Sequence, residues 1–250
     1  MYFFVSRVTF PELVIREDER NRAAGFDLDG VDSDGSAEGA GCRQRDVVSL
    51  DGRFGGVDNQ GAALVPTLDS VLTTDLATTA ATAIGEGRFG VLVELRHWNV
   101  TANDDCVDVI VHQASPVAPL DLDPDGAPRP GQSFVAEGMP RHFVNERMED
   151  GELRADSGGF PVPQPFMSDL QSAHLRLQWD GAQMSGVVAG DLPASLAVAT
   201  LFCREPRIPE SVLDDILTSV ADLRPDSEGG CEGISWAFEI ETVSALLADI

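Results

Sequence analysis

Two valine-rich stretches decide the fold of this chain: "RFGVLVELRHWNV" at residues 88–100 and "CVDVIVHQ" at residues 106–113. Apolar and β-branched residues dominate both, and this composition is typical of strands. Between them lie Asn103, Asp104 and Asp105, residue types that turns prefer. The pattern predicts a β-hairpin and favours an antiparallel sheet for the rest of the chain.

Further strand-like runs follow the hairpin, and short polar turns, "EDG" and "DG", separate two pairs of them. These runs are "QSFVAEG" (132–138), "RHFVNERM" (141–148), "ELRADSG" (152–158), "HLRLQW" (174–179), "QMSGVVAG" (183–190) and "ISWAFEIETV" (234–243). Many short strands with turn signals between them indicate a β-sandwich-like core.

Leucine and valine recur at helical spacing in a first segment, at about residues 59–84. Asp58 or Asn59 can cap its first turn, and Gly85 can close its last turn. Pro66 is expected to interrupt it, because proline lacks the N–H that a helix interior requires.

A second helical segment, at about residues 209–223, places Val212, Ile216 and Val220 on one stripe. With the strands, it completes the expected architecture. We predict a mostly β, α+β fold with a β-sandwich-like core of antiparallel strands and two helical segments.

Three parts of the chain differ in composition. Residues 1–20 form an N-terminal segment, and residues 21–58 are rich in aspartate and glycine with no period of a strand or a helix, which indicates ordered loop or linker. Residues 59–250 hold the sandwich-like domain with its helical additions. The length fits one domain overall.

The net charge of −25 restricts the partners of the protein. An acidic surface repels phosphate backbones and anionic headgroups, so nucleic acids and membrane surfaces are disfavoured, and cations are attracted. Solubility of a secreted protein explains the charge equally well. No apolar run approaches the roughly 18 residues of a membrane span, and "MYFFVSRVTF" lacks the features of an export signal.

Cys42, Cys106, Cys203 and Cys231 have neither CxxC spacing nor a nearby histidine, so a zinc site is not expected. An even number of scattered cysteines fits two disulfides in an oxidising compartment. Cys203 ends the apolar run "LAVATLFC", and with Cys231 it brackets the helix of residues 209–223. A Cys203–Cys231 bond would join the two ends of this helix to neighbouring strands, so we favour it, which leaves Cys42 to pair with Cys106. Four buried free thiols are the alternative.

The stretch "DLDPDGAPRPGQ" at residues 121–132 begins like a calcium-binding loop. Ca²⁺ takes six to eight oxygen ligands, and Asp121, Asp123 and Asp125 at alternate positions can aim carboxylates at one centre. A glutamine stands where an EF-hand has its bidentate glutamate, and prolines forbid a following helix. We predict a weak, structural Ca²⁺ site, with a solvated Asp/Gly turn as the alternative.

The stretch "DLDGVDSDG" at residues 27–35 has a similar density of carboxylates in a looser spacing. Asp27, Asp29, Asp32 and Asp34 are its candidate Ca²⁺ ligands. Here too a plain turn is the alternative.

Glu239 and Glu241 in "FEIET" point to one face of a strand, as the paired carboxylates of a glycosidase must. The Glu-x-Asp-x-Glu motif of β-sandwich glycosidases is incomplete here. We expect a solvent-facing pair on an edge strand.

His97 and His112 would lie directly opposite each other if the hairpin had a two-residue turn. Two imidazoles so placed could share a metal ion, although no third ligand at fixed spacing is visible. Structural histidines on a half-exposed sheet are the favoured interpretation.

A carbohydrate-binding module would need exposed aromatic side chains for sugar stacking. The chain has one tyrosine and three tryptophans, so Trp98, Trp179 and Trp236 are the candidates. Trp98 is expected to share a face with apolar strand residues and to lie in the core.

Two resemblances follow from these motifs. "DLDGVDSDG" and "DLDPDG" resemble the aspartate repeats of thrombospondin type 3 and related extracellular calcium motifs. Over residues 25–240, "GFDLDG", "GVDNQ", "NDDCVDV", "DPDGAPRPGQSF" and "CEGISWAFE" resemble a family of uncharacterised secreted proteins and lipoproteins of gliding, predatory bacteria. This resemblance implies export and an even number of cysteines.

The combined expectation is a non-enzymatic, extracellular or cell-surface protein whose aspartate loops bind Ca²⁺ structurally. Its partner would be an unknown extracellular protein or a glycan. The alternative is a β-sandwich glycoside hydrolase or a carbohydrate-binding module.

Overall fold

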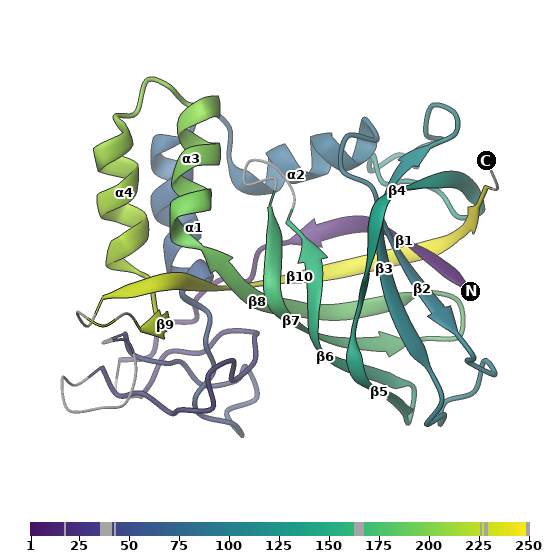
Figure 1. Cartoon of the computed structure of the whole chain (residues 1–250), viewed down its shortest axis with the longest axis horizontal. Coiled ribbons are helices and arrows are strands. Elements are labelled where there is room, and N and C mark those ends of the chain that lie inside the picture. The colour runs from purple at the N-terminus through teal and green to yellow at the C-terminus, as the bar shows by residue number, and fades with distance from the viewer. Residues whose placement is uncertain are drawn as a thin grey trace.

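The computed structural model describes residues 1–17, 19–35, 42, 44–162, 168–225, 227 and 230–248. Within them, ten strands form a single sheet, and the helices α1, α3 and α4 gather at one end of it (Figure 1). The mostly β, α+β class is confirmed. The strands are β1 (Tyr2–Thr9), β2 (Val91–Arg96), β3 (Asp108–Pro116), β4 (Gln132–His142), β5 (Val144–Glu149), β6 (Glu152–Pro161), β7 (Asp169–Trp179), β8 (Met184–Pro193), β9 (Leu223–Pro225) and β10 (Cys231–Leu247).

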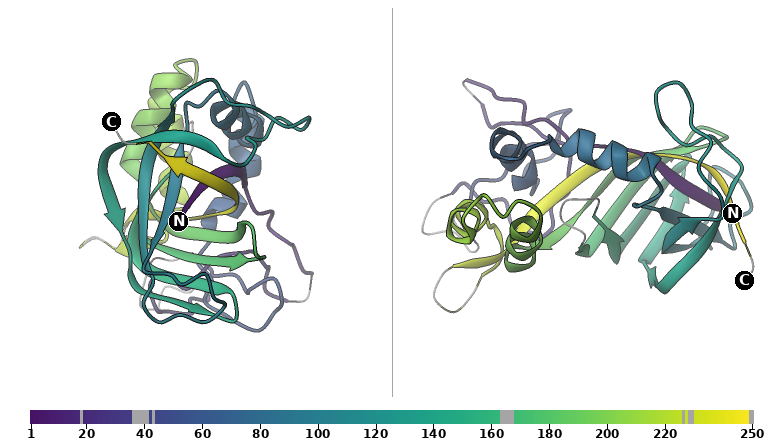
Figure 2. Two further views of the ribbon diagram at one scale, coloured as in Figure 1. Left: turned by 90° about the vertical axis from the view of Figure 1, so that its right-hand side faces the viewer. Right: turned by 90° about the horizontal axis from the view of Figure 1, so that it is seen from above.

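The sheet curls back on itself. Its strand order is β1-β2-β3-β4-β10-β8-β7-β6-β5, and β1 also pairs with β10, so the ladder of pairings returns to its start. Figure 2 shows the curled sheet end-on. The core therefore lies inside one curled sheet, between its opposite sides. The sequence had suggested a sandwich of two stacked sheets instead.

Aromatic contacts across the interior mark this core. Phe4 on β1 stacks on Phe134 on β4 with ring centroids 4.1 Å apart, and Trp98 meets Trp179 edge to face at 4.9 Å. Phe160 on β6 contacts Phe238 on β10 at 5.7 Å, although two strands separate β6 from β10 in the sheet. Such aromatic pairs supply much of the apolar area that stabilises a fold.

The first residues of the chain belong to the sheet itself. β1 pairs with β10 from Tyr2–Ala245 to Thr9–Glu239, and it pairs with β2 on its other side. The N-terminal segment 1–20 thus contributes a strand to the same folded unit as residues 59–248.

The described residues between 21 and 58 are ordered loop and not linker. Isolated bridges join Arg22 to Val48 and Val47 to Val57, and the buried side chains of Ala23, Val47 and Val57 form a small core with Ala62. The region packs against the start of the first helix by this apolar contact.

The helices are α1 (Gln60–Val71), α2 (Leu76–Gly85), α3 (Ala194–Arg204) and α4 (Glu210–Ser219). The expected segment 59–84 is two helices. Asn59 caps α1, Asp75 caps α2, and Pro66 lies inside α1 without ending it.

Two expectations about the later helices were wrong. The run "LAVATLFC", which we read as strand-like, belongs to α3, whose inner face buries Ala197 and Leu201, four residues apart. In α4 the buried side chains are Leu213 and Leu217, whereas Val212 on the predicted stripe is 41% exposed. The stripe is therefore rotated by about one position from the one we predicted.

The hairpin is confirmed, but its predicted register was wrong. β2 and β3 pair with His112 opposite Leu92, and residues 97–107 form a long connection instead of a two-residue turn. His97 has a φ of 58° and its Nδ1 lies 2.9 Å from Asp108, while His112 bonds to the buried Glu94. The two histidines do not face each other.

The disulfide pairing was also wrong. Cys42 is bonded to Cys231, with the Cα atoms 5.9 Å apart, while Cys106 and Cys203 are exposed free thiols. Cys203 is excluded from the favoured pair because it lies on the exposed side of α3. The observed bond ties the Asp/Gly-rich region to the start of β10.

Candidate functional site

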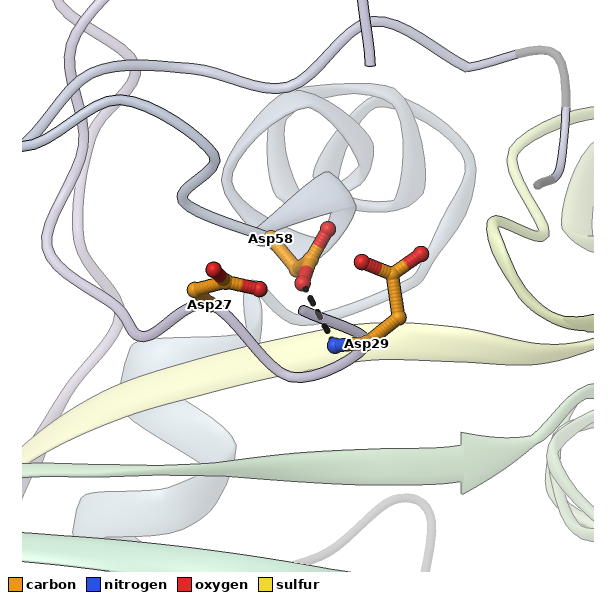
Figure 3. Close-up of side chains that lie close together, drawn as sticks. All are labelled: Asp27, Asp29 and Asp58. Carbon is orange, nitrogen blue, oxygen red and sulfur yellow. Dashed lines mark hydrogen bonds between the residues drawn. The ribbon is translucent and has the colours of Figure 1, made fainter. Parts of the chain in front are cut away.

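Three carboxylates meet where the Asp/Gly-rich region joins the first helix. One oxygen from each of Asp27, Asp29 and Asp58 lies within 4.8 Å of the others (Figure 3). Asp27 and Asp29 are exposed, whereas Asp58 is only 1% exposed. A buried carboxylate that faces two others is an arrangement that a cation stabilises.

The start of α1 fixes Asp58 in this position. Asn59 caps the helix by accepting from the Ala62 N–H at 3.1 Å, and its own amide donates to the Ala24 carbonyl at 2.7 Å. A Cβ on Gly61 would lie 2.9 Å from the Trp236 indole, so the absence of a side chain lets the first turn pack on β10. Asp58 therefore enters the protein interior just before the helix begins.

The loop before Asp58 wraps around its carboxylate. The Leu28 N–H donates to Asp58 Oδ2 at 2.6 Å, and the Phe26 carbonyl accepts from the Asp58 N–H at 2.8 Å. Asp27 accepts from the Gly30 N–H at 2.6 Å, and the backbone of Asp29 also donates to Asp58, at 3.3 Å. These bonds turn the loop so that its carboxylates lie beside the buried one.

Two more buried aspartates lie behind this group. Asp46 lies close enough for its charge to act on Asp58, and Asp222 accepts from both the N–H and the hydroxyl of Ser235, at 2.6 and 2.5 Å. The Gln60 N–H, at the α1 N-terminus, donates to the same hydroxyl at 2.8 Å. We call the five residues Asp27, Asp29, Asp46, Asp58 and Asp222 the aspartate cluster.

Loss of hydration raises the pKa of Asp29, Asp46, Asp58 and Asp222. Loss of hydration raises the pKa of Asp58 to about 9, and the charges of Asp46 and Asp222 add to the effect. Burial likewise raises the pKa of Asp222 to about 7 and raises the pKa of Asp46 and of Asp29. In the absence of a cation, Asp58 therefore holds a proton at neutral pH.

No member of the aspartate cluster forms an ion pair with a basic side chain in the described part of the chain. Arg20 is the basic residue that comes near, and its guanidinium bonds to Asp32 at 2.5 Å and to the Asp46 carbonyl at 3.1 Å. Its ion pair is thus with Asp32, and its charge lowers the pKa of Asp46 without an ion pair to that carboxylate.

The aspartates predicted at residues 27–34 separate into two groups. Asp27 and Asp29 join Asp58, whereas Asp32 pairs with Arg20 and accepts from the Gly56 N–H at 3.1 Å. Asp34 is bridged through its backbone to Arg45. The sequence pattern therefore identified two of the three residues that come together.

The 121–125 loop forms a tight turn of its own. Asp123 Oδ1 accepts from the N–H groups of Asp125 and Ala127, both at 2.9 Å, and Asp121 lies 3.7 Å from the Arg129 guanidinium. Among the described residues, Asp27, Asp29 and Asp58 form the one group of His, Cys, Asp or Glu side chains close enough to share a metal ion. The Ca²⁺ prediction for residues 121–125 thus has no support from the geometry.

Glu239 and Glu241 lie on β10, which is flanked by β1 and β8, so the expected edge strand was wrong. Glu239 is half-buried and Glu241 is exposed, 3.6 Å from Arg7. Both line a small hollow of about 240 Å³ beside Ser185. The two carboxylates are two residues apart on one strand, and no facing wall of the hollow supplies a further acid.

The tryptophans lie in the core and offer no stacking platform. Trp236 is fully buried, Trp98 is 9% exposed, and Trp179 packs edge to face against Trp98. Sugar binding by these three side chains is therefore unsupported.

Sequence reasoning missed Asp46 and Asp222 and treated Asp58 only as a helix cap. One feature of the sequence points to Asp58. Asn59 beside it is also a residue type that caps helices, so only one of the two is needed as the cap and the other can have a different role. Asp46 and Asp222 have no local signal, because residues far apart in the sequence bring them to the helix start.

A comparison of the chain with protein-family models, curated proteins and solved structures found no significant match. Among the described residues, no helix is long and apolar enough to cross a membrane.

Proposed function

We propose that the protein is an extracellular binding protein in which Ca²⁺, held by Asp27, Asp29 and Asp58, fastens the loop of the Asp/Gly-rich region to the start of α1. The observation that carries the proposal is the fully buried carboxylate of Asp58, which faces two further carboxylates and has no ion-pair partner in the described residues. A cation at this point would let all three ionise.

The ligand atoms favour Ca²⁺ among the common metals. All three side chains offer oxygen, the ligand that hard cations take, and the cluster includes neither histidine nor cysteine. Ca²⁺ accepts six to eight oxygens in flexible geometry, so waters and loop carbonyls can complete the shell. Mg²⁺ demands a tighter octahedron and gives up its waters reluctantly.

The location of the cluster supports a structural role. Asp27 and Asp29 come from the loop, Asp58 precedes α1, and the Cys42–Cys231 bond ties the same region to β10. Ca²⁺ would therefore act beside a covalent link at one junction. A disulfide is typical of an oxidising compartment, where calcium is also abundant, and this fits the family resemblance in sequence.

Linkage between calcium and protons tests the proposal. Because Asp58 holds a proton in the free protein, Ca²⁺ binding must release it. Calorimetric titration in buffers of different ionisation enthalpy should give close to one proton released per Ca²⁺ near pH 7. The apparent affinity should rise by up to about tenfold per pH unit between about pH 6 and pH 8.

Asp58→Asn should remove both the binding and the proton release, and Asp123→Asn should leave both unchanged. Equal Ca²⁺ affinity in wild type and Asp58→Asn would contradict the proposal, as would a wild type without measurable Ca²⁺ binding.

A further inference from the structure

A groove of about 580 Å³ lies between the Asp/Gly-rich region and the face of the sheet formed by β5, β6 and β7. Phe26 and Phe54 line it from the loop side, and Arg147, Arg154 and Arg176 line it from the strands. Its volume is in the range of small-molecule sites. The groove is lined only by described residues and is separate from the hollow beside Glu239.

The three arginines form a row across neighbouring strands. Arg147 on β5 is the direct partner of Arg154 on β6, and Arg154 is the direct partner of Arg176 on β7. Like charges directly opposite each other destabilise a sheet. A row of three cations is unexpected in a chain of net charge −25, unless an anion lies between them.

The neighbours of this row leave much of its charge uncompensated. Arg154 pairs with Glu152, whereas Arg147 and Arg176 form no ion pair with a described residue. Arg176 lies 5.2 Å from the centre of the Phe26 ring, a cation–π contact that keeps its guanidinium at the groove.

Two carboxylates also line the groove, and both have other partners. Asp156 bonds to His174 Nδ1 at 2.9 Å. Asp27 accepts from the Gly30 N–H and belongs to the aspartate cluster. The lining of the groove thus has three arginines and two carboxylates.

The side chains define the ligand chemistry. Guanidinium groups bind carboxylate, sulfate and phosphate through paired N–H donors, which ammonium groups cannot do. The chain has no lysine, so every basic side chain it contains is of this type. Phe54, 63% exposed, and Phe26 offer apolar faces beside the arginine row.

We infer that this groove binds a small organic oxyanion, a carboxylate or phosphate ester with a planar apolar body, its charge held by the arginine row and its body by Phe26 and Phe54. The ligand would also relieve the repulsion within the row. The arginine row contains no member of the aspartate cluster, although Asp27 lines the groove and also belongs to that cluster.

Phenyl phosphate and benzoate are suitable probes, titrated calorimetrically into the full chain. Arg154→Gln and Arg176→Gln should each weaken the tighter probe by about tenfold, the scale of a lost charge-assisted hydrogen bond. Arg7→Gln removes the same charge from β1, which does not line the groove. This variant should weaken binding of the probe by less than about twofold.

Phe54→Ala separates the two halves of the site. It should weaken phenyl phosphate and leave inorganic phosphate unchanged. Tighter binding of phenyl phosphate or of benzoate identifies which oxyanion the row prefers, and either result supports the inference.

Absence of saturable binding for both probes would overturn the inference. It would also be overturned if Arg7→Gln weakened binding as much as the groove variants, because the effect would then be one of general charge. Circular dichroism confirms that each variant is folded. Unchanged Ca²⁺ binding in the arginine variants would separate this site from the aspartate cluster.

Discussion

The two aspartate-rich loops of this protein have similar sequences and different structures. At residues 121–125, Asp123 satisfies its own turn, and the neighbouring carboxylates do not converge. At residues 27–29, the same alternation of aspartates lies beside Asp58. The Leu28 N–H donates to Asp58, although the two residues are 30 positions apart in the sequence. The comparison shows that alternate aspartates specify a turn. Only the loop beside Asp58 joins its carboxylates to a buried one from elsewhere in the described chain.

The largest expected effect concerns the disulfide that holds the first loop's region. Cys42 and Cys231 are separated by 189 residues, and a bond closing so long a loop stabilises a fold by on the order of 4–5 kcal/mol. Cys42→Ser with Cys231→Ser should lower the melting temperature strongly. Thermal unfolding followed by circular dichroism measures the loss.

The matched control is Cys106→Ser with Cys203→Ser, which removes two exposed thiols and should leave the melting temperature nearly unchanged. If the two double variants lost equal stability, the observed pairing would be refuted. In that case no disulfide would stabilise the region of the first loop, and the two loops would not differ in this respect.

The next effect is a pH dependence confined to the first loop. The pKa of Asp58 is about 9 in the folded protein and near 4 in the unfolded chain, so the folded state binds more protons between these values. Without calcium, the stability that Asp58 contributes should therefore be fully present below about pH 4 and fall as the pH rises, by at most about 1.4 kcal/mol per unit.

Asp222, with a pKa of about 7, adds to the fall at lower pH. Asp58→Asn should thus remove the decline above about pH 7, and Asp123→Asn should keep all of it. Urea unfolding at a series of pH values measures the dependence. Stability that rises between about pH 7 and pH 9 in calcium-free wild type would refute the assigned protonation.

Local patterns predicted the strands well, because alternation and turn residues lie within a few positions of each other. They predicted Asp27 and Asp29 for the same reason. They failed for α3, where an apolar run was taken for a strand although Ala197 and Leu201 have helical spacing. They failed for Asp46, Asp222 and the Cys42–Cys231 bond, because contacts between distant parts of the chain determine these.

Calcium bound at the first loop should raise the free energy of unfolding by about 1 kcal/mol, and the second loop should not contribute to this effect. With a dissociation constant of roughly 10⁻⁴ to 10⁻³ M, typical of extracellular sites, about 1 mM Ca²⁺ stabilises the folded state by that amount. Chelation should lower the melting temperature of wild type by a few degrees, and Mg²⁺ should restore little of it. Asp58→Asn should lose this response and Asp123→Asn should retain it; the opposite result would move the site to residues 121–125.

The smallest effect isolates the turn at residues 121–125. Asp123 accepts two backbone hydrogen bonds through Oδ1, so Asp123→Ala should cost roughly 1 kcal/mol, as loss of a comparable cap does at a helix start. Asp123→Asn keeps an acceptor oxygen and should cost less. Neither loss should depend on calcium, because the turn is held by its own backbone. Asp27→Ala also loses the bond from the Gly30 N–H, but its loss of stability should be larger with calcium than with chelator. Thermal unfolding of the three variants with calcium and with chelator tests this difference. A calcium-dependent loss in Asp123→Ala would mean that the two loops bind the ion in the same way, and that the buried third carboxylate is dispensable.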